Sequence, residues 1–235
     1  RELSKNNKII LVCPKGKTQK SNFKVYQTFE DVAKEKTFNF KFLKKLKEII
    51  KKEKPDEIQL EFPWQAINLI LIGRRFSLDE HNIEFLRFKR TGSKIWLLIY
   101  LYELIACKFA DEIICVSGTD KEYLSKYFKV NPNKIKVIEN PVDKSIFYPN
   151  KKVKNKIRKE LNLKPKEKFI LFFGQLNYKP NVEALKIIAS EIIPRLNKNK
   201  VNYKIVVCGK GDGKGFLNNF KHPNLIFKRF VNRIQ

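Results

Sequence analysis

Four consecutive polar residues, Asp79, Glu80, His81 and Asn82, lie at the carboxyl end of a strand candidate that spans 76–80. In open parallel sheets, ligands bind beyond the carboxyl ends of the strands. These four residues are therefore a plausible lining for a binding cleft. The residues themselves also allow a structural role, in which Asp79 or Asn82 caps a helix and His81 only packs.

A second candidate segment, Gly209–Phe216 (GKGDGKGF), is rich in glycine and follows a strand-like run. It does not match the P-loop pattern, because Lys214 stands where that pattern has its second glycine, and it lacks the third glycine of the dinucleotide-binding pattern. Gly209 and Gly211 would still let backbone N–H groups approach a phosphate closely. An ordinary turn between a strand and a helix is the alternative.

Apolar runs of strand length alternate with amphipathic segments along the chain, which is the pattern of βαβ units with parallel strands and right-handed crossovers. The strands are apolar throughout, as expected for sheets covered on both faces. Strands are expected at 8–13, 57–62, 76–80, 112–116, 134–138, 168–173, 203–208 and 224–227. Helices are expected at 42–50, 66–72, 119–128 and 182–192, with a long helical stretch that is broken near Gly92 and ends at Phe109.

The composition changes between Asp143 and Lys156, where few residues could contribute to a core, and this segment is interpreted as a linker. A second strand–helix series follows it. We therefore expect an α/β protein with two Rossmann-like parallel-sheet domains, at residues 1–149 and 150–235. The second series has too few helices to cover its sheet, so that domain is expected to be incomplete in this chain.

The chain has 50 basic and 24 acidic residues and a formal charge of +26, with the larger excess per residue in its second part. Such a charge attracts nucleic acid, anionic lipid or nucleoside diphosphates. A lysine-rich composition without functional meaning is the simpler explanation. No recognition helix, zinc-ligand spacing or aromatic stacking motif supports a specific nucleic-acid partner. The four cysteines lie within or near strand-like runs and are interpreted as buried thiols in a reducing compartment.

The segment Ile95–Ala110 is strongly apolar, but it is shorter than a membrane-spanning helix and contains Glu103 and Lys108. A buried core helix is favoured over a helix that lies on a membrane surface.

The segment Ala110–Pro149 (ADEIICVSGTDKEYLSKYFKVNPNKIKVIENPVDKSIFYP) closely resembles the junction between the two halves of family-four glycosyltransferases. Lys54–Trp64, Leu78–Arg90 and Phe172–Leu196 are similar to further segments of that family. The resemblance covers nearly the whole chain. It implies a GT-B fold whose first strand and acceptor loop lie before Arg1 and whose paired acidic motif lies after Gln235. The chain by itself is then expected to be inactive.

The resemblance implies that the parent protein is a hexosyltransferase that uses a UDP-, GDP- or similar nucleotide sugar, retains anomeric configuration and needs no metal or other cofactor. The expected acceptor is a lipid-linked or cell-surface glycan in cell-envelope polysaccharide biosynthesis. The expected location is the cytoplasm, with peripheral binding to the inner face of an anionic cell membrane. An inactive transferase-like fragment and a basic protein that binds nucleic acid or other anions are the alternatives.

The resemblance also assigns roles to residues. His81 would face the donor sugar as the catalytic residue, while Asn82, Glu84, Ser117 and Asn140 would line the acceptor side or the cleft. The donor would be bound by Gly174, Gln175, Lys179, Asn181, Gly209 and Gly211.

The sequence departs from the family pattern at three positions. Asn140 precedes Pro141 where glycine is common, and Gln175 and Pro180 occupy the usual donor-phosphate positions. Lys179 is the candidate replacement cation.

Overall fold

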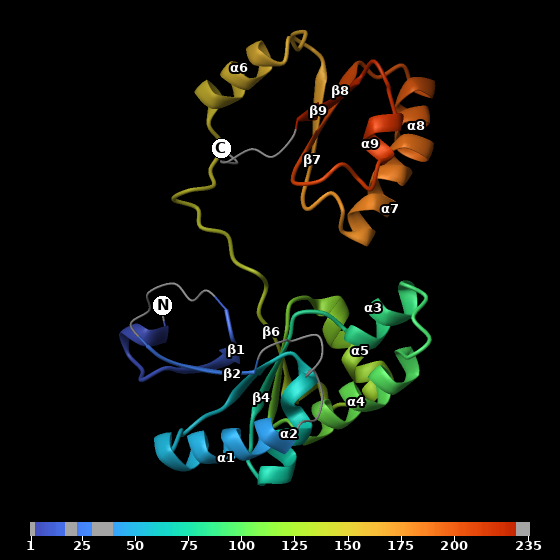
Figure 1. Cartoon of the computed structure of the whole chain (residues 1–235). Coiled ribbons are helices and arrows are strands. Elements are labelled where there is room, and N and C mark those ends of the chain that lie inside the picture. Colours follow the sequence, from blue (N-terminus) through green and yellow to red (C-terminus); the bar gives the residue numbers. More distant parts are fainter. Residues whose placement is uncertain (1–2, 17–22, 30–39, 229–235) are drawn as a thin grey trace. The chain divides into compact units, whose positions relative to one another are not determined.

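The chain divides into two compact units, Arg1–Pro141 and Val142–Gln235. The structure is a computed structural model that describes residues 3–16, 23–29 and 40–228 (Figure 1). The division falls a few residues before the boundary expected at residue 149. Each unit has its own hydrophobic cluster, and no residue belongs to both clusters. Each unit is therefore an α/β body with its own core.

The first unit contains a four-stranded parallel sheet and a smaller two-stranded parallel sheet. The larger sheet has the order β3-β4-β5-β6, and the smaller one pairs β1 with β2. The strands are β1 (Ile10–Pro14), β2 (Lys24–Phe29), β3 (Gln59–Glu61), β4 (Ser77–Glu80), β5 (Glu112–Cys115) and β6 (Ile135–Val137). Because all four strands of the larger sheet are parallel, their carboxyl ends lie at the same edge.

Five α-helices and three short 3₁₀ helices, among the described residues, complete this unit. The α-helices are α1 (Phe40–Glu53), α2 (Ala66–Ile72), α3 (Glu84–Arg90), α4 (Trp96–Phe109) and α5 (Gly118–Phe128), and the 3₁₀ helices are Leu3–Lys5, Pro63–Gln65 and Pro132–Lys134. Helices α3, α4 and α5 lie together on one side of the larger sheet (Figure 1). The break expected near Gly92 separates α3 from α4, and Gly92 has a φ of 71° that favours glycine.

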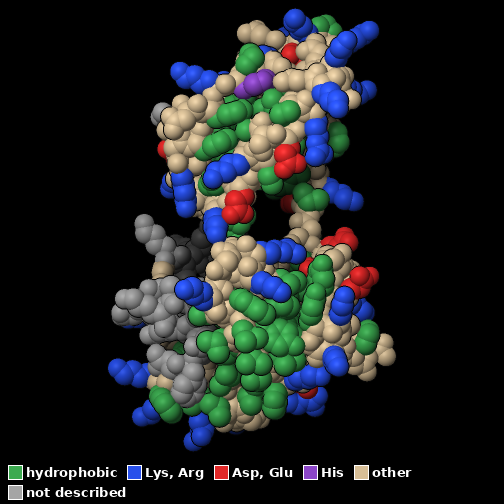
Figure 2. All heavy atoms as spheres, turned by 90° about the vertical axis from the view of Figure 1, so that its right-hand side faces the viewer, with side chains coloured by type: hydrophobic (Ala, Val, Ile, Leu, Met, Phe, Trp, Pro, Cys, Tyr) green, Lys and Arg blue, Asp and Glu red, His purple; other side chains and the backbone are tan. Residues whose placement is uncertain are grey.

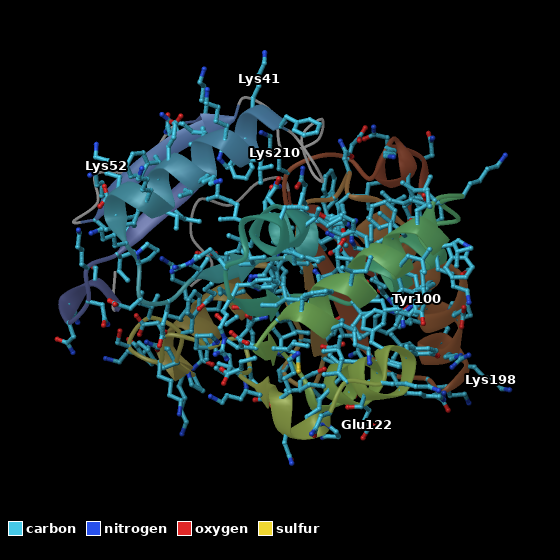
Figure 3. All side chains as sticks on the ribbon, turned by 90° about the horizontal axis from the view of Figure 1, so that it is seen from below. Lys41, Lys52, Tyr100, Glu122, Lys198 and Lys210 are labelled. Atoms are coloured by element: carbon cyan, nitrogen blue, oxygen red, sulfur yellow. The ribbon has the colours of Figure 1, made fainter. Side chains whose placement is uncertain are left out.

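Helix α1 illustrates how the sequence pattern determines packing. Phe42, Leu46 and Ile49 recur at helical spacing and are buried in the unit. Lys41 and Lys52 point outward from the opposite side of the helix (Figure 3). The apolar stripe therefore fixes which face of α1 covers the core.

The second unit is a three-stranded parallel sheet with the order β7-β8-β9. Its elements are α6 (Lys151–Glu160), β7 (Lys168–Phe173), α7 (Lys179–Ile187), α8 (Ile193–Lys198), β8 (Tyr203–Cys208), α9 (Phe216–Asn219) and β9 (Leu225–Lys228). Helices α7, α8 and α9 lie on one side of this sheet (Figure 1). Phe169, Leu171 and Phe173 alternate along β7 and are at least 38% exposed, so part of the sheet is left uncovered, as expected.

Helices α7 and α8 are joined by a π-helical turn, Ile188–Ile192. Pro194 in the first turn of α8 has no backbone N–H and cannot donate to the carbonyl four residues earlier. The N–H of Ile193 donates instead to Ile188, five residues earlier. The π turn thus accommodates the proline without ending the helical path.

The linker expected at 143–156 is wrong in its second half, because α6 begins at Lys151. The Asn150 side chain accepts hydrogen bonds from the N–H groups of Lys152 and Val153 and so caps this helix. No residue of α6 is buried, and for this reason a search for core-forming residues missed it. Strand β2 was also missed, because its residues Lys24–Phe29 include polar side chains and are not a continuous apolar run.

We expect Leu78→Ala to lower the free energy of unfolding of the first unit by about 2–5 kcal/mol, because Leu78 is fully buried in the central strand β4. Leu71→Ala removes the same atoms from a side chain that is 60% exposed and should change stability by less than about 0.5 kcal/mol. Both tryptophans, Trp64 and Trp96, lie in the first unit, so denaturant unfolding followed by tryptophan fluorescence reports on this unit. Equal losses for the two variants would contradict the assigned core.

Candidate functional site

The carboxyl edge of the larger sheet gathers polar side chains from neighbouring strands. Glu61 is the register partner of Asp79, and His81 follows β4 directly. Within β4, Leu78 and Glu80 are buried while Ser77 and Asp79 are partly exposed, as the two-residue period of a strand requires. Asp79 is therefore on the open face of the strand and Glu80 is on the core face.

Glu61, Asp79 and His81 form a compact group at this edge, with one ligand atom of each within 4.8 Å of the others. The Nε2 atom of His81 lies 2.6 Å from Oε2 of Glu61. Burial raises the pKa of Asp79, a nearby His81 opposes that shift and the charge of Glu61 adds to it. Carboxylate and imidazole groups are also ligands for divalent cations. The expectation of a metal-independent site stays a prediction.

Phe62 joins β3 to the 3₁₀ helix that follows and packs beside the histidine. Its ring centroid lies 4.8 Å from that of His81, and its N–H donates to the carbonyl of Asp79 at 3.0 Å. Phe62 has a φ of 70°, which is an uncommon conformation for a bulky residue. Backbone strain of this kind persists where the surrounding structure fixes it and is frequent at functional sites.

Three glutamates lie in the core next to this edge, and none of them is more than 2% exposed: Glu80, Glu84 and Glu103. Glu103 on α4 accepts hydrogen bonds from the N–H groups of Glu84 and Phe85, both at 2.8 Å. It thereby satisfies two of the N–H groups at the start of α3 that have no partner within the helix. A side chain of α4 thus holds the segment that leads from His81 into α3.

Burial controls the protonation of two of these acids. It raises the pKa of Glu103 to about 8, although the two backbone N–H groups favour the charged form. Burial, followed by the charges of Glu103, Glu84 and Asp79, also raises the pKa of Glu80 well above its ordinary value. The Oε2 atom of Glu80 is buried without a hydrogen-bond partner, while Cys107 Sγ lies 4.0 Å from its Oε1. Glu80 is therefore favoured as a neutral carboxylic acid.

The other residues expected at the acceptor side have diverse surroundings. Asn82 is exposed, whereas Glu84 is buried and forms an ion pair with Arg87. The Ser117 hydroxyl accepts from the N–H of Asp120 at 3.1 Å and caps α5. Asn140 is exposed after β6. Ser117 thus has a structural role at the same sheet edge, and the predicted binding roles of all four residues stay predictions.

In the second unit, the loops after β7 and β8 lie against each other. A Cβ atom on Gly209 would lie 1.8 Å from the carbonyl oxygen of Gly174, and Gly209 has a φ of 151°. Asn181 Nδ2 donates to the carbonyl of Gln175 at 3.0 Å, and a Cβ on Gly174 would lie 2.8 Å from this amide nitrogen. Gly209 is therefore needed for the close approach of the two loops, whereas the missing side chain of Gly174 leaves room for the amide of Asn181.

Asn177 connects these loops and was missed in the sequence. Its Oδ1 atom accepts from the N–H of Lys214 at 2.9 Å and from that of Asp212 at 3.2 Å. A Cβ on Gly211 would lie 2.7 Å from the Asn177 side chain. Lys179 is the exposed first residue of α7. Of the residues expected to bind the donor, Gly174, Gln175, Gly209 and Gly211 thus belong to one pair of interlocked loops, and Asn181 in the first turn of α7 contacts the first of them.

A family model described as Glycosyltransferase Family 4 matches residues 1–146. An uncharacterized glycosyltransferase of Methanocaldococcus jannaschii is 29% identical over 57% of the chain and 35% of its own length. The UDP-Gal:alpha-D-GlcNAc-diphosphoundecaprenol alpha-1,3-galactosyltransferase of Escherichia coli is 30% identical over 66% of the chain and 42% of its own length. The chain therefore spans well under half the length of these two curated relatives.

Solved structures share the fold at low sequence identity. WaaG, a glycosyltransferase involved in lipopolysaccharide biosynthesis, aligns with a TM-score of 0.60 and 11% identity over 97% of this chain and 63% of its own. Anabaena HepE in complex with UDP and glucose aligns with a TM-score of 0.57 and 13% identity over 89% of this chain and 56% of its own. A UDP-N-acetylglucosamine 2-epimerase from Rickettsia bellii reaches 0.54, so the fold alone does not separate transferases from epimerases. The expected α/β, GT-B-type fold is confirmed.

Glu103 makes the stability of the first unit depend on pH. Because its pKa is about 8 in the folded unit and 4.5 ordinarily, its contribution is complete below pH 4.5 and is lost as the pH rises through 8. We expect the free energy of unfolding to fall by a few kcal/mol across this range. Glu103→Gln should flatten this decline, as measured by denaturant unfolding at about pH 5 and about pH 8.

The matched control is Glu48→Gln, which changes an exposed carboxylate on α1. It should keep the pH dependence of the original chain. An unchanged decline in Glu103→Gln would show that this carboxyl group does not titrate between the two pH values.

Proposed function

Because the chain belongs to glycosyltransferase family 4, we propose that the whole protein transfers a hexosyl group from a nucleotide-diphosphate sugar to a glycan acceptor. The family match over residues 1–146 is the observation that carries this proposal. Two relatives support a uridine nucleotide, since one is named for UDP-Gal and another structure contains UDP and glucose. The proposed reaction retains anomeric configuration and needs neither a metal nor another cofactor.

The donor diphosphate is assigned to the interlocked loops of the second unit. Negative charge grows on the diphosphate as the sugar leaves, and preorganised N–H groups and cations stabilise that charge best. The N-terminus of α7 and the lysines Lys179, Lys210 and Lys214 supply such groups on the two loops. The contacts of Asn177, described above, keep the loop backbone in place before a ligand arrives.

The sugar itself is assigned to His81 at the carboxyl edge of the first unit. His81 is 35% exposed, so a ligand can reach its ring, and it already contacts a carboxylate. Asn82 is exposed beside it and is proposed to contact the acceptor.

We expect His81→Ala to lower kcat/KM for hexosyl transfer from a UDP-hexose by roughly 10- to 100-fold, because the bound sugar would keep a desolvated polar group without its hydrogen-bond partner. The assay uses the whole protein and measures UDP release together with glycosylated acceptor. His222→Ala is the matched control, because His222 is the other histidine and lies in a polar loop of the second unit. Full activity of His81→Ala would contradict the proposed role of His81. If the unsubstituted whole protein transfers no sugar, the alternative of an inactive transferase-like protein is favoured.

The acceptor is proposed to be lipid-linked and reached at the cytoplasmic face of an anionic membrane, in cell-envelope polysaccharide biosynthesis. Large apolar side chains of α4 are at least 41% exposed: Leu97, Leu98, Leu101, Ile105 and Phe109. Figure 2 shows hydrophobic side chains gathered on one face of the first unit, with lysine and arginine at several points of its margin. No described helix is long and apolar enough to cross a membrane.

The charges on α4 favour an anionic bilayer as the occupant of this surface. Lys94 and Lys108 are exposed at the two ends of the apolar stripe, and Glu103, the one acidic residue of α4, is fully buried. Helix α4 is apolar on most of its surface, and an exposed apolar face of this kind, flanked by basic residues, is suited to contact with a membrane surface. Basic residues near the surface each add about 1 kcal/mol of attraction to anionic lipid.

We expect the chain to co-sediment with vesicles that contain phosphatidylglycerol, more weakly with pure phosphatidylcholine, and less at high salt. Leu98→Ser combined with Leu101→Ser should lower the vesicle-bound fraction several-fold, and so should Lys94→Glu combined with Lys108→Glu. Ile187→Ser changes an exposed residue of the second unit and should leave the vesicle-bound fraction unchanged. Equal binding of all variants would refute the α4 surface. A dimer in solution that the same α4 variants disrupt would assign this surface to a second copy instead.

A further inference from the structure

Glu61 is engaged through both of its carboxylate oxygens. Oε2 lies 2.6 Å from Nε2 of His81, and Oε1 accepts a hydrogen bond from Nε2 of Gln59 at 3.0 Å. Gln59 and Glu61 are both exposed on β3 while Leu60 between them is partly buried, so the first two share the open face of the strand. Gln59, Glu61 and His81 therefore form a hydrogen-bonded row along the carboxyl edge of the sheet.

This row contributes little to stability. The side chains of Glu61 and His81 are 56% and 35% exposed, and exposed ion pairs are weak because water screens them. The row instead restricts orientation. The ring of Phe62 lies against His81 on one side, and the carboxylate fixes one ring nitrogen. The imidazole is thus held by a carboxylate and an aromatic ring that come from the same strand end.

A carboxylate can only accept a hydrogen bond, so Nε2 must carry the proton in the Glu61 contact. In the neutral ring, Nδ1 then has the free lone pair and acts as an acceptor. We infer that Glu61 is a positioning residue that holds His81 as the Nε2–H tautomer, so that Nδ1 accepts a hydrogen bond from a sugar hydroxyl. The tautomer follows from the contact, whereas the sugar hydroxyl rests on the proposed function.

Asp79 provides an internal comparison, because it is the second carboxylate beside His81. Its ligand atom lies within 4.8 Å of those of Glu61 and His81. No hydrogen bond joins its carboxylate to the imidazole among the described residues. Asp79 acts on this region through its backbone carbonyl, which accepts from Phe62. If proximity of negative charge were enough, Asp79 would fix the tautomer as well as Glu61 does.

The tautomer is measured by NMR of the 235-residue chain labelled with ¹⁵N-histidine, at a pH where the rings are neutral. The chain has two histidines, and His222→Gln assigns their signals. We expect Nε2 of His81 to carry the proton. Glu61→Ala should give a mixture of tautomers, and Glu61→Gln should largely restore the Nε2–H form through its amide oxygen. Two controls should leave the tautomer unchanged. Asp79→Asn neutralises the other carboxylate near His81, and Glu57→Ala removes an exposed carboxylate that precedes β3.

A proton on Nδ1 in the unsubstituted chain, or a tautomer that Glu61→Ala does not alter, would overturn the inference whatever the activity of the protein.

The link to transfer is tested separately in the whole protein. We expect Glu61→Ala to lower kcat/KM about tenfold, Glu61→Gln to recover most of it and Glu57→Ala to have no effect. If His81→Ala abolishes transfer while Glu61→Ala alters the tautomer and keeps full activity, the tautomer has no role in catalysis, although the proposed function stands. If His81→Ala keeps full activity, the proposed role of His81 fails, and the NMR result still decides the structural part.

Discussion

Parallel pairing of β3, β4 and β5 is the constraint on which the rest of the first unit depends. It places the carboxyl ends of these strands at one edge, and the alternation of side chains then sorts the residues of β4 between two environments. Asp79 is on the open face, where Glu61 and His81 also lie, while Glu80 is on the core face with Glu103. A shift of β4 by one residue would exchange these faces and would bury the polar cluster in place of Leu78.

The core face of the same edge explains how a polar segment is held in a fixed conformation. Burying an ionised carboxyl group is unfavourable unless hydrogen bonds or charges compensate for lost solvation. Glu103 receives two backbone N–H groups, yet burial still raises its pKa to about 8, so desolvation outweighs these bonds. At Glu80, whose Oε2 has no hydrogen-bond partner, no such bond offsets the loss of solvation. The start of α3, and with it the chain after His81, is therefore fixed at some cost in stability.

The sequence predicted the elements with strong apolar patterns and missed those defined by pairing. The apolar runs at 112–116 and 203–208 became β5 and β8, and the helix at 66–72 has the predicted bounds. Strand β2 was missed because it is not a continuous apolar run, and helix α6 was missed because none of its residues is buried in a core. Glu61 belonged to a predicted strand, but its contact with His81 depends on the register of β3 against β4, which no local pattern specifies. Glu103 was taken as a polar interruption of an apolar helix, whereas it binds two N–H groups of α3.

The donor loops show the same limit in a different form. Gly174 and Gly209 were recognisable as candidates, but the reason for Gly209 appears only in the fold, because the backbone of the loop after β7 occupies the space that a side chain at 209 would need. Asn177 then links the loops by accepting from two N–H groups of the second loop, a pairing between residues 35 and 37 positions apart in the chain. Loops held in this way lose little further conformational freedom when an anion binds, and the reduced entropic loss favours binding. In the proposed binding of a diphosphate, fixed backbone geometry would therefore add to the charge of the lysines.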